Sequence, residues 1–124
     1  MAERRHFRWH TQLPLYFEVA QFGTYPTEHL RGKRGRGQTY DLAEEGLSFF
    51  SALRLPVNMI LLLELTIPEL GTLKLKGRVV RSRPWQEGWL TGVQFIGFNG
   101  PRRQALREHI AHQVKSKYQL IEYL

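Results

Sequence analysis

The sequence contains no cysteine and no long apolar segment, since its longest apolar run, residues 59–63, is stopped by Glu64. Without cysteine the chain has no disulfides, no thiolate metal ligands and no cysteine nucleophile. That run is far shorter than the ~20 residues that a membrane-spanning helix needs. No apolar stretch follows the first residues, as it would in a signal peptide. We therefore expect a soluble, cytoplasmic protein without membrane insertion.

Signatures of catalysis are also missing. The sequence has no Gly-x-Ser-x-Gly elbow, no phosphate loop ending in Gly-Lys-Ser/Thr and no dinucleotide fingerprint. Two histidine pairs, at 6 and 10 and at 109 and 112, have helical spacing, but neither has a third metal ligand nearby in sequence. The adjacent acids at 44 and 45 are typical of a turn that faces water. We expect a protein that is not an enzyme and that holds no metal or cofactor.

The composition is that of one globular domain with a basic bias. The chain has 124 residues, 42% of them hydrophobic, and its aromatic residues (Phe 7, Tyr 5, Trp 3) can build a single core. The net charge is +7, with +4 in residues 1–40, −4 in residues 41–70 and +7 in residues 71–124. This distribution favours an anionic partner bound at local sites over a uniformly basic surface.

The hydrophobic pattern predicts six strands followed by one helix. Strand-like runs lie at 13–19, 38–43, 46–52, 58–67, 72–82 and 89–98. Residues 23–37 are rich in glycine and arginine and are expected to form a loop or a weak hairpin. After Pro101 the apolar residues recur with helical spacing, and Asn99 or Gly100 can cap the helix. Strands without intervening helices pair antiparallel, which indicates a mostly β sandwich or barrel.

Three segments of this single domain are expected. Residues 1–12 form a flexible basic N-terminal arm, residues 13–98 form the β-barrel, and residues 99–124 form the C-terminal helix and tail. The tail keeps apolar residues to its end, so it is expected to dock on the barrel or, as the alternative, to pair with another subunit in a homodimer.

Two short motifs carry the functional signal. The first is an arginine pair, Arg4 and Arg8, with Arg5 beside it. Arginine offers a planar fork that fits phosphate oxygens or the O6 and N7 atoms of guanine. The second motif runs from Asp41 to Gly46 and has the composition of a tight turn. A carboxylate fixed there could accept hydrogen bonds from a guanine edge, and the glycine permits a close backbone approach.

In this order and about 33 residues apart, the two motifs resemble those of the PilZ domain family. Members carry an Arg-x-x-x-Arg arm, a small six-stranded antiparallel β-barrel and an Asp/Asn-x-Ser-x-x-Gly turn, and they typically bind the bacterial second messenger cyclic di-GMP. The segments at 47–49, 77–80 and 92–95 and the final helix also look like the family. The resemblance thus implies a PilZ-like barrel with a C-terminal α-helix, and it covers nearly the whole chain.

The resemblance also implies roles for single residues. Arg4 and Arg8 would grip phosphate and the Hoogsteen edge of a guanine, and Arg5 would be a second phosphate contact. Asp41 would hold the other guanine edge, and Gly46 would let the turn close on the ligand. The free arm would be ordered by the ligand and would then signal to a partner protein in the control of motility, adhesion or exopolysaccharide.

One position departs from the family pattern. Where the family has serine, this chain has Ala43, which can neither donate nor accept a hydrogen bond. A dry, unpaired ligand group there would cost about 1–3 kcal/mol, or roughly tenfold to a hundredfold in affinity. Trp9 or Trp85 could stack on a base of the ligand, but we expect both to pack within the protein.

Two alternatives remain open at this point. Ala43 and the apolar tail are compatible with a degenerate barrel that has lost the nucleotide and serves as a protein-interaction module. The basic charge and the Arg/Gly stretch at 31–37 are compatible with a small nucleic-acid-binding barrel. Of the three functions, nucleic-acid binding is the least favoured, because the aromatic residues do not gather on one strand where bases could stack on them.

Overall fold

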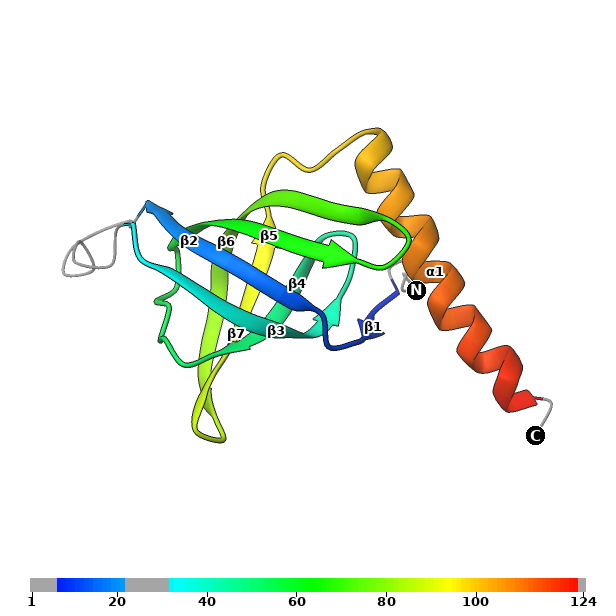
Figure 1. The fold of residues 1–124 in the computed structure, drawn as a ribbon, viewed down its shortest axis with the longest axis horizontal. Coiled ribbons are helices and arrows are strands. Elements are labelled where there is room, and N and C mark those ends of the chain that lie inside the picture. The colour runs from blue at the N-terminus through cyan, green and yellow to red at the C-terminus, as the bar shows by residue number, and fades with distance from the viewer. Residues whose placement is uncertain (1–6, 22–31, 123–124) are drawn as a thin grey trace, which may run out of the picture.

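The structure is a computed structural model that describes residues 7–21 and 32–122, with side chains for residues 7–20 and 32–115. It contains seven strands and one helix in these parts of the chain (Figure 1). Their bounds are β1 Trp9–His10, β2 Pro14–Gln21, β3 Arg34–Leu42, β4 Gly46–Ser51, β5 Ile60–Ile67, β6 Gly71–Trp85, β7 Gly88–Phe95 and α1 Pro101–Glu122.

Six of the strands close into an antiparallel barrel. Along the sheet the order is β1-β3-β2-β5-β6-β7-β4, and β4 pairs back with β3. The closed ring therefore runs through β2, β3, β4, β7, β6 and β5, and every pairing within it is antiparallel. The short β1 is an extra strand on β3, with Trp9 opposite Leu42 and His10 opposite Asp41. The predicted six-stranded barrel with a C-terminal helix is confirmed.

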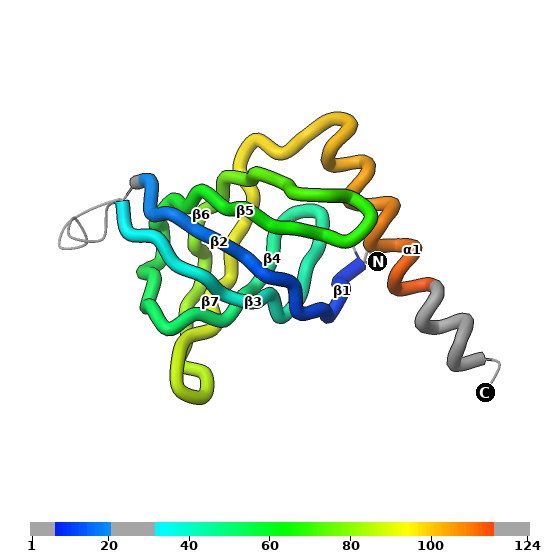
Figure 2. The backbone as a smooth tube through the Cα atoms, in the orientation of Figure 1, coloured from blue at the N-terminus to red at the C-terminus, as the bar shows by residue number. Residues whose placement is uncertain are grey.

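The core fills the barrel and extends to the helix. Alternate residues of each strand point inward because successive side chains in a strand lie on opposite faces. Leu106 and Ile110 of α1 are fully or almost fully buried and belong to the same cluster as the barrel interior. The largest completely buried side chains include Phe49, Leu15, Leu42, Leu55, Leu61 and Leu65. The helix therefore packs against one end of the barrel, next to β1 (Figure 2).

Two prolines lie at the starts of elements, and the helix start at Pro101 agrees with the sequence pattern. Pro14 is the first residue of β2. Proline has no backbone N–H to donate, and at the first residue of a strand this loss disturbs the hydrogen bonds of the sheet least. Pro101 is the first residue of α1, and the amide of Gln104 donates to the carbonyl of Gly100 at 3.0 Å. Gly100 has φ of 74°, so this residue marks the boundary between the loop and the helix.

Residues 23–37 were predicted as a loop or a weak hairpin, and the loop alternative is wrong for residues 34–37, which belong to β3 and pair antiparallel with residues 15–18 of β2. In this strand the arginines point outward and the glycines inward, where Gly35 lies against the ring of Phe17. Gly37 lies against the backbone of Phe50 in the same way. Glycine and arginine thus alternate with the two-residue period of a strand, although the composition of this segment is typical of a loop.

Candidate functional site

The two motifs singled out in the sequence meet in space. Arg8 Nη1 donates to Asp41 Oδ2 at 3.2 Å, a contact between residues 33 positions apart. The Asp41 side chain is 12% exposed and that of Arg8 is 34% exposed, so the ion pair is partly shielded from water. Arg4 and Arg5 lie outside the described residues. Of the predicted arginine arm, the structure therefore places Arg8.

A serine on the neighbouring strand completes the environment of the carboxylate. The hydroxyl of Ser48 in β4 donates to Asp41 Oδ1 at 2.7 Å. The two residues are opposite each other because the pairing of β3 with β4 shifts between Thr39 and Asp41, which leaves Tyr40 as an extra residue. Both carboxylate oxygens of Asp41 therefore accept a hydrogen bond from within the chain, and the group has a fixed orientation.

This contact is the start of a row that crosses four strands. Ser48 is opposite Gly92 of β7, and Gly92 is opposite Arg81 of β6. A Cβ atom on Gly92 would lie 2.9 Å from Cγ and 3.0 Å from Nε of Arg81, so the arginine side chain lies flat across the glycine. We call Asp41, Ser48, Gly92 and Arg81 the polar row. It lies on the outer face of the barrel, since its neighbours Val79 and Val93 point into the core.

Aromatic side chains lie beside the polar row on the same face. Tyr40 and Phe50 make an edge contact with ring centroids 5.5 Å apart, and Trp85 lies 6.1 and 5.9 Å from these two rings. We call these three residues the aromatic patch. The guanidinium of Arg83 lies 4.9 Å from the ring centroid of Trp85. A surface concavity of about 390 Å³ borders Phe50 and Trp85 and is also lined by Arg36.

The turn between β3 and β4 is closed by its own backbone. The amide of Ala43 donates to the carbonyl of Gly46 at 2.9 Å, and the Ala43 side chain is fully buried. A Cβ atom on Gly46 would overlap the carbonyl oxygen of Val93. The close backbone approach predicted for Gly46 is thus made to β7, and it fixes the turn against the neighbouring strand.

Glu44, in the middle of this turn, points to the helix. Its Oε2 accepts from Arg103 Nε at 3.0 Å and from Arg107 Nε at 2.8 Å, and its side chain is only 5% exposed. Buried carboxylates are stable when they are paired in this way. The expectation that the acid pair at 44–45 faces water is therefore wrong for Glu44.

The polar row and the aromatic patch together provide three kinds of chemistry. A fixed carboxylate accepts hydrogen bonds from N–H groups such as those on a guanine edge. The arginine side chains of Arg8 and Arg81 are suited to phosphate oxygens. Exposed aromatic rings bordered by arginine can stack on bases. One face of the barrel thus combines groups that suit a guanine nucleotide.

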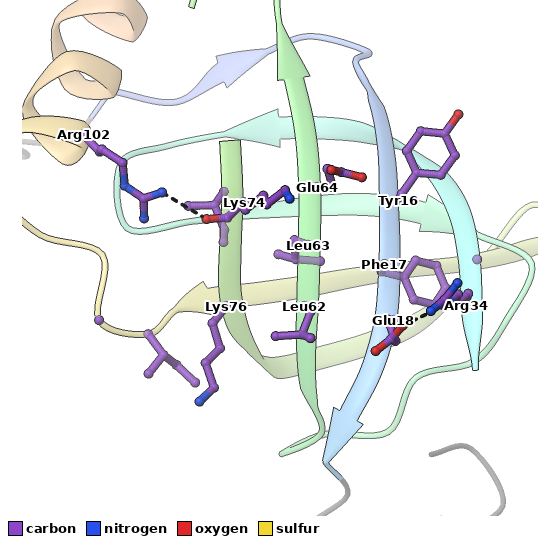
Figure 3. Close-up of a pocket in the computed structure, with 14 residues that line it drawn as sticks. Tyr16, Phe17, Glu18, Arg34, Leu62, Leu63, Glu64, Lys74, Lys76 and Arg102 are labelled. Carbon is purple, nitrogen blue, oxygen red and sulfur yellow. Dashed lines mark hydrogen bonds and ion pairs between the residues drawn. The ribbon is translucent and has the colours of Figure 1, made fainter. Parts of the chain in front are cut away.

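A second, wider concavity lies on another part of the barrel. A groove of about 750 Å³ lies on β2, β5 and β6 and holds Tyr16, Leu62 and several charged residues (Figure 3). Both acids of its lining lie near a cation: Arg34 Nε donates to Glu18 Oε1 at 2.7 Å, and Glu64 is opposite Lys74 on adjacent strands. Lys76 and Arg102 are further cations of the lining. Paired charges of this kind on an open surface do not single out a ligand.

The described residues contain neither a metal-binding cluster nor a membrane-spanning helix. Within residues 7–21 and 32–122, no group of three or more histidine, aspartate or glutamate side chains could hold a metal ion. In the described part of the chain, no helix is both long enough and apolar enough to cross a membrane.

Ser48, Gly92 and Arg81 were not singled out from the sequence as site residues. Their positions beside Asp41 depend on the register of β3, β4, β7 and β6 and on two bulges, one at Tyr40 and one at Val80. Alternation assigns them to the outer face but not to a common row. Ser48 and Gly92 also lie in the segments 47–49 and 92–95 that resemble the family, but that resemblance gave them no role. Trp85 does lie on this face, whereas Trp9 packs against His109 of α1.

Comparisons with known proteins agree with this geometry. A family model described as the PilZ domain matches residues 2–112. The chain is similar to the inhibitor of motility MotI/DgrA of Bacillus subtilis, with a TM-score of 0.73 and 17% identity over 94% of this chain and 54% of that one. It is similar to the PilZ domain of YcgR from Escherichia coli with c-di-GMP, with a TM-score of 0.66 and 13% identity over 99% and 100% of the two chains.

A third similar structure is the MrkH–c-di-GMP complex of K. pneumonia, with a TM-score of 0.63 and 15% identity over 96% of this chain and 54% of that one. The present chain therefore spans about half the length of MotI and MrkH. At these identities the structural matches show a shared fold. A comparison with curated proteins gave no match. The family match over residues 2–112, together with this shared barrel, shows that the chain belongs to the PilZ domain family.

Proposed function

We propose that this chain is a receptor for cyclic di-GMP that acts by binding, without catalysis. The observation that carries the proposal is the pairing of Arg8 with Asp41 at one end of a polar row that ends in Arg81. Family membership supports the same ligand, since similar PilZ structures from Escherichia coli and K. pneumonia contain c-di-GMP. The ligand is a cyclic dinucleotide with two phosphates and two guanines, so it needs cations, a carboxylate and stacking surfaces together.

The proposed binding mode exchanges an internal contact for ligand contacts. Asp41 would accept from the N1 and N2 donors of one guanine, and Arg8 would turn from Asp41 to a phosphate or to the guanine O6 and N7 atoms. Arg4 and Arg5 would add phosphate contacts from the same arm. In this mode the N-terminal arm closes over the polar row, and Gly46 keeps the turn in place beneath it.

Two features of the face extend this mode. Ser48 offers a hydroxyl next to Asp41, which would offset the one that Ala43 lacks. Arg81 lies across Gly92 with its guanidinium toward the middle of the row, where it would contact the second phosphate. A base would stack on the aromatic patch, because Tyr40 is 39% exposed and Trp85 is only half-buried. These assignments make the ligand span β3, β4, β7 and β6.

Isothermal titration calorimetry with cyclic di-GMP tests the proposal. The wild type is compared with Arg8→Ala, and Arg34→Ala is the matched control because its ion pair with Glu18 lies on another part of the barrel. GTP is the control for the nucleotide. Loss of charge-assisted hydrogen bonds worth about 1.5–3 kcal/mol should weaken binding by Arg8→Ala roughly tenfold to a hundredfold.

The expected pattern is saturable binding of cyclic di-GMP, no heat with GTP, weak binding by Arg8→Ala and unchanged binding by Arg34→Ala. Equal binding by both arginine variants would place the ligand away from the polar row. The absence of binding by the wild type at high nucleotide concentration would reject the receptor role.

One observation favours a second candidate, a protein-interaction module that does not bind the nucleotide. Both oxygens of Asp41 already accept hydrogen bonds within the chain, and Ala43 brings no hydroxyl to the turn. Such a module would form a stable complex with a partner protein or with a second copy of itself. Its melting temperature would then be the same with and without cyclic di-GMP.

A further inference from the structure

The residues on both sides of Arg8 contact the helix. Trp9 makes an edge contact with His109 of α1, with ring centroids 5.5 Å apart and an interplanar angle of 67°. Lys115 Nζ lies 6.0 Å from the ring centroid of Phe7. The three consecutive residues 7–9 therefore contact two different parts of the protein. Arg8 binds Asp41 in β3, whereas Phe7 and Trp9 pack on α1.

The first half of α1 is held independently of this segment. Arg103 and Arg107 both donate to Glu44, and Leu106 is buried in the barrel core. The two ion pairs with the buried Glu44 carboxylate and the burial of Leu106 hold the first half of α1 against the barrel. His109 and Lys115 lie further along the helix, where the contacts to residues 7–10 add to those of Ile110.

A small cavity lies where the three elements meet. It has a volume of about 160 Å³ and is lined by Phe7, Glu44, Arg107, Glu108, Ile110 and Ala111. The cavity is open to the surface, and Phe7, which lines it, is itself 41% exposed and lies outside the barrel core.

A guanine that uses Asp41 through its N1 and N2 donors needs both carboxylate oxygens, and Arg8 now donates to one of them. Ser48 can keep its bond to the other, because a carboxylate oxygen accepts more than one hydrogen bond. In the proposed mode Arg8 leaves Asp41 for the ligand. Phe7 and Trp9 are its chain neighbours, and Trp9 also pairs with Leu42 in the short β1 strand, so a shift of this segment would have to loosen β1 as well. We propose that nucleotide binding and the packing of Phe7 and Trp9 on α1 compete, so that the ligand uncovers the part of the helix from His109 to Lys115. This inference rests on the proposed receptor function and gives it an output surface on α1.

Competition makes a prediction about affinity, because coupling between two equilibria is reciprocal. His109→Ala removes the ring that contacts Trp9 in the nucleotide-free protein. The substitution therefore destabilises the free state and leaves the bound state, in which this contact is lost, unchanged. An aromatic pair is worth about 0.5–1.5 kcal/mol, so His109→Ala should bind cyclic di-GMP roughly twofold to tenfold more tightly than the wild type. His112→Ala is the matched control, because His112 is an exposed histidine on the same helix.

Unchanged or weaker binding by His109→Ala would overturn the inference, and so would tighter binding by both histidine variants. Calorimetry of the wild type in the same series tests the receptor function separately. If the wild type binds but the two histidine variants do not differ, the proposed function stands and the coupling to α1 fails.

A second readout follows the arm directly. In protein labelled with 5-fluorotryptophan, the ¹⁹F resonance of Trp9 is assigned with Trp9→Phe. Saturating cyclic di-GMP should move this resonance toward its position in His109→Ala. In the absence of nucleotide, Asp41→Asn should move it in the same direction, since the variant weakens the tie that holds Arg8. A Trp9 resonance that stays in place in both experiments would overturn the coupling even if the nucleotide does not bind.

Discussion

At the residue scale, the orientation of Asp41 depends on one hydroxyl. Ser48 donates to Asp41 Oδ1 at 2.7 Å and is almost fully buried, so water does not replace it easily. A buried acceptor that loses its donor keeps the cost of desolvation. The carboxylate would then turn toward Arg8 alone, away from the geometry that a guanine edge requires.

Two serines on β4 allow a matched test of this role. Ser48 donates to Asp41, whereas Ser51, buried on the same strand, donates to the carbonyl of Leu53 at 2.8 Å. We expect Ser48→Ala and Ser51→Ala each to lower the free energy of unfolding by about 1 kcal/mol, measured by urea denaturation. Only Ser48→Ala should weaken binding of cyclic di-GMP, by up to about tenfold. Equal affinities for the two variants would show that Asp41 needs no partner on β4.

At the scale of the elements, the β3–β4 turn is fixed by contacts on three sides. Its backbone is closed by the Ala43 to Gly46 hydrogen bond, Glu44 ties it to α1, and Gly46 packs on the backbone of β7. The turn is therefore a rigid support for Asp41. A side chain at Gly46 would push β4 away from β7.

Gly46→Ala tests this packing. The added methyl group overlaps a backbone carbonyl, which cannot rotate away, so we expect a loss of at least about 2 kcal/mol in the free energy of unfolding. Gly97→Asn is the control, because Gly97 has φ of 64° and open space around it, and asparagine tolerates this conformation at a cost below about 1 kcal/mol. Similar losses in the two variants would mean that the contact with β7 is not what requires glycine at position 46.

Most of the elements could be predicted because each depends on a local pattern. Alternation identified the strands, and Pro101 with Leu106 and Ile110 identified the helix. The start of β3 could not be predicted from composition, since its inward positions are glycines that fit only against Phe17 and the backbone of β4. That requirement is visible only once the strands are paired.

The site was predictable in part for the same reason. Arg8 and Asp41 were identified by their motifs, and the structure brings them into contact. Arg81 was not, because its place in the polar row depends on a bulge that shifts the register between Val79 and Arg81. Glu44 was expected to face water, but the helix supplies two arginines from about 60 residues further along the chain.

At the scale of the whole molecule, the barrel has two different faces. The polar row and the aromatic patch lie on β3, β4, β7 and the second half of β6, whereas the groove lies on β2, β5 and the first half of β6 and is also lined by Arg34 at the start of β3 (Figures 1 and 3). The helix α1 contacts both β1 and the β3–β4 turn. Arg102 of α1 also lines the groove and donates to the carbonyl of Lys74 at 3.3 Å, so the helix touches both faces. In the proposed mode a ligand on the first face acts on the helix through Phe7 and Trp9.

The measurement that tests this account most directly is a ¹H–¹⁵N spectrum recorded during titration with cyclic di-GMP. We predict that amide shifts concentrate at Arg8, Asp41, Ser48, Gly92 and Arg81, while amides of the groove such as Leu62 and Lys76 change little. A spectrum that does not change at saturating nucleotide, or one whose shifts centre on β2 and β5, would contradict the account.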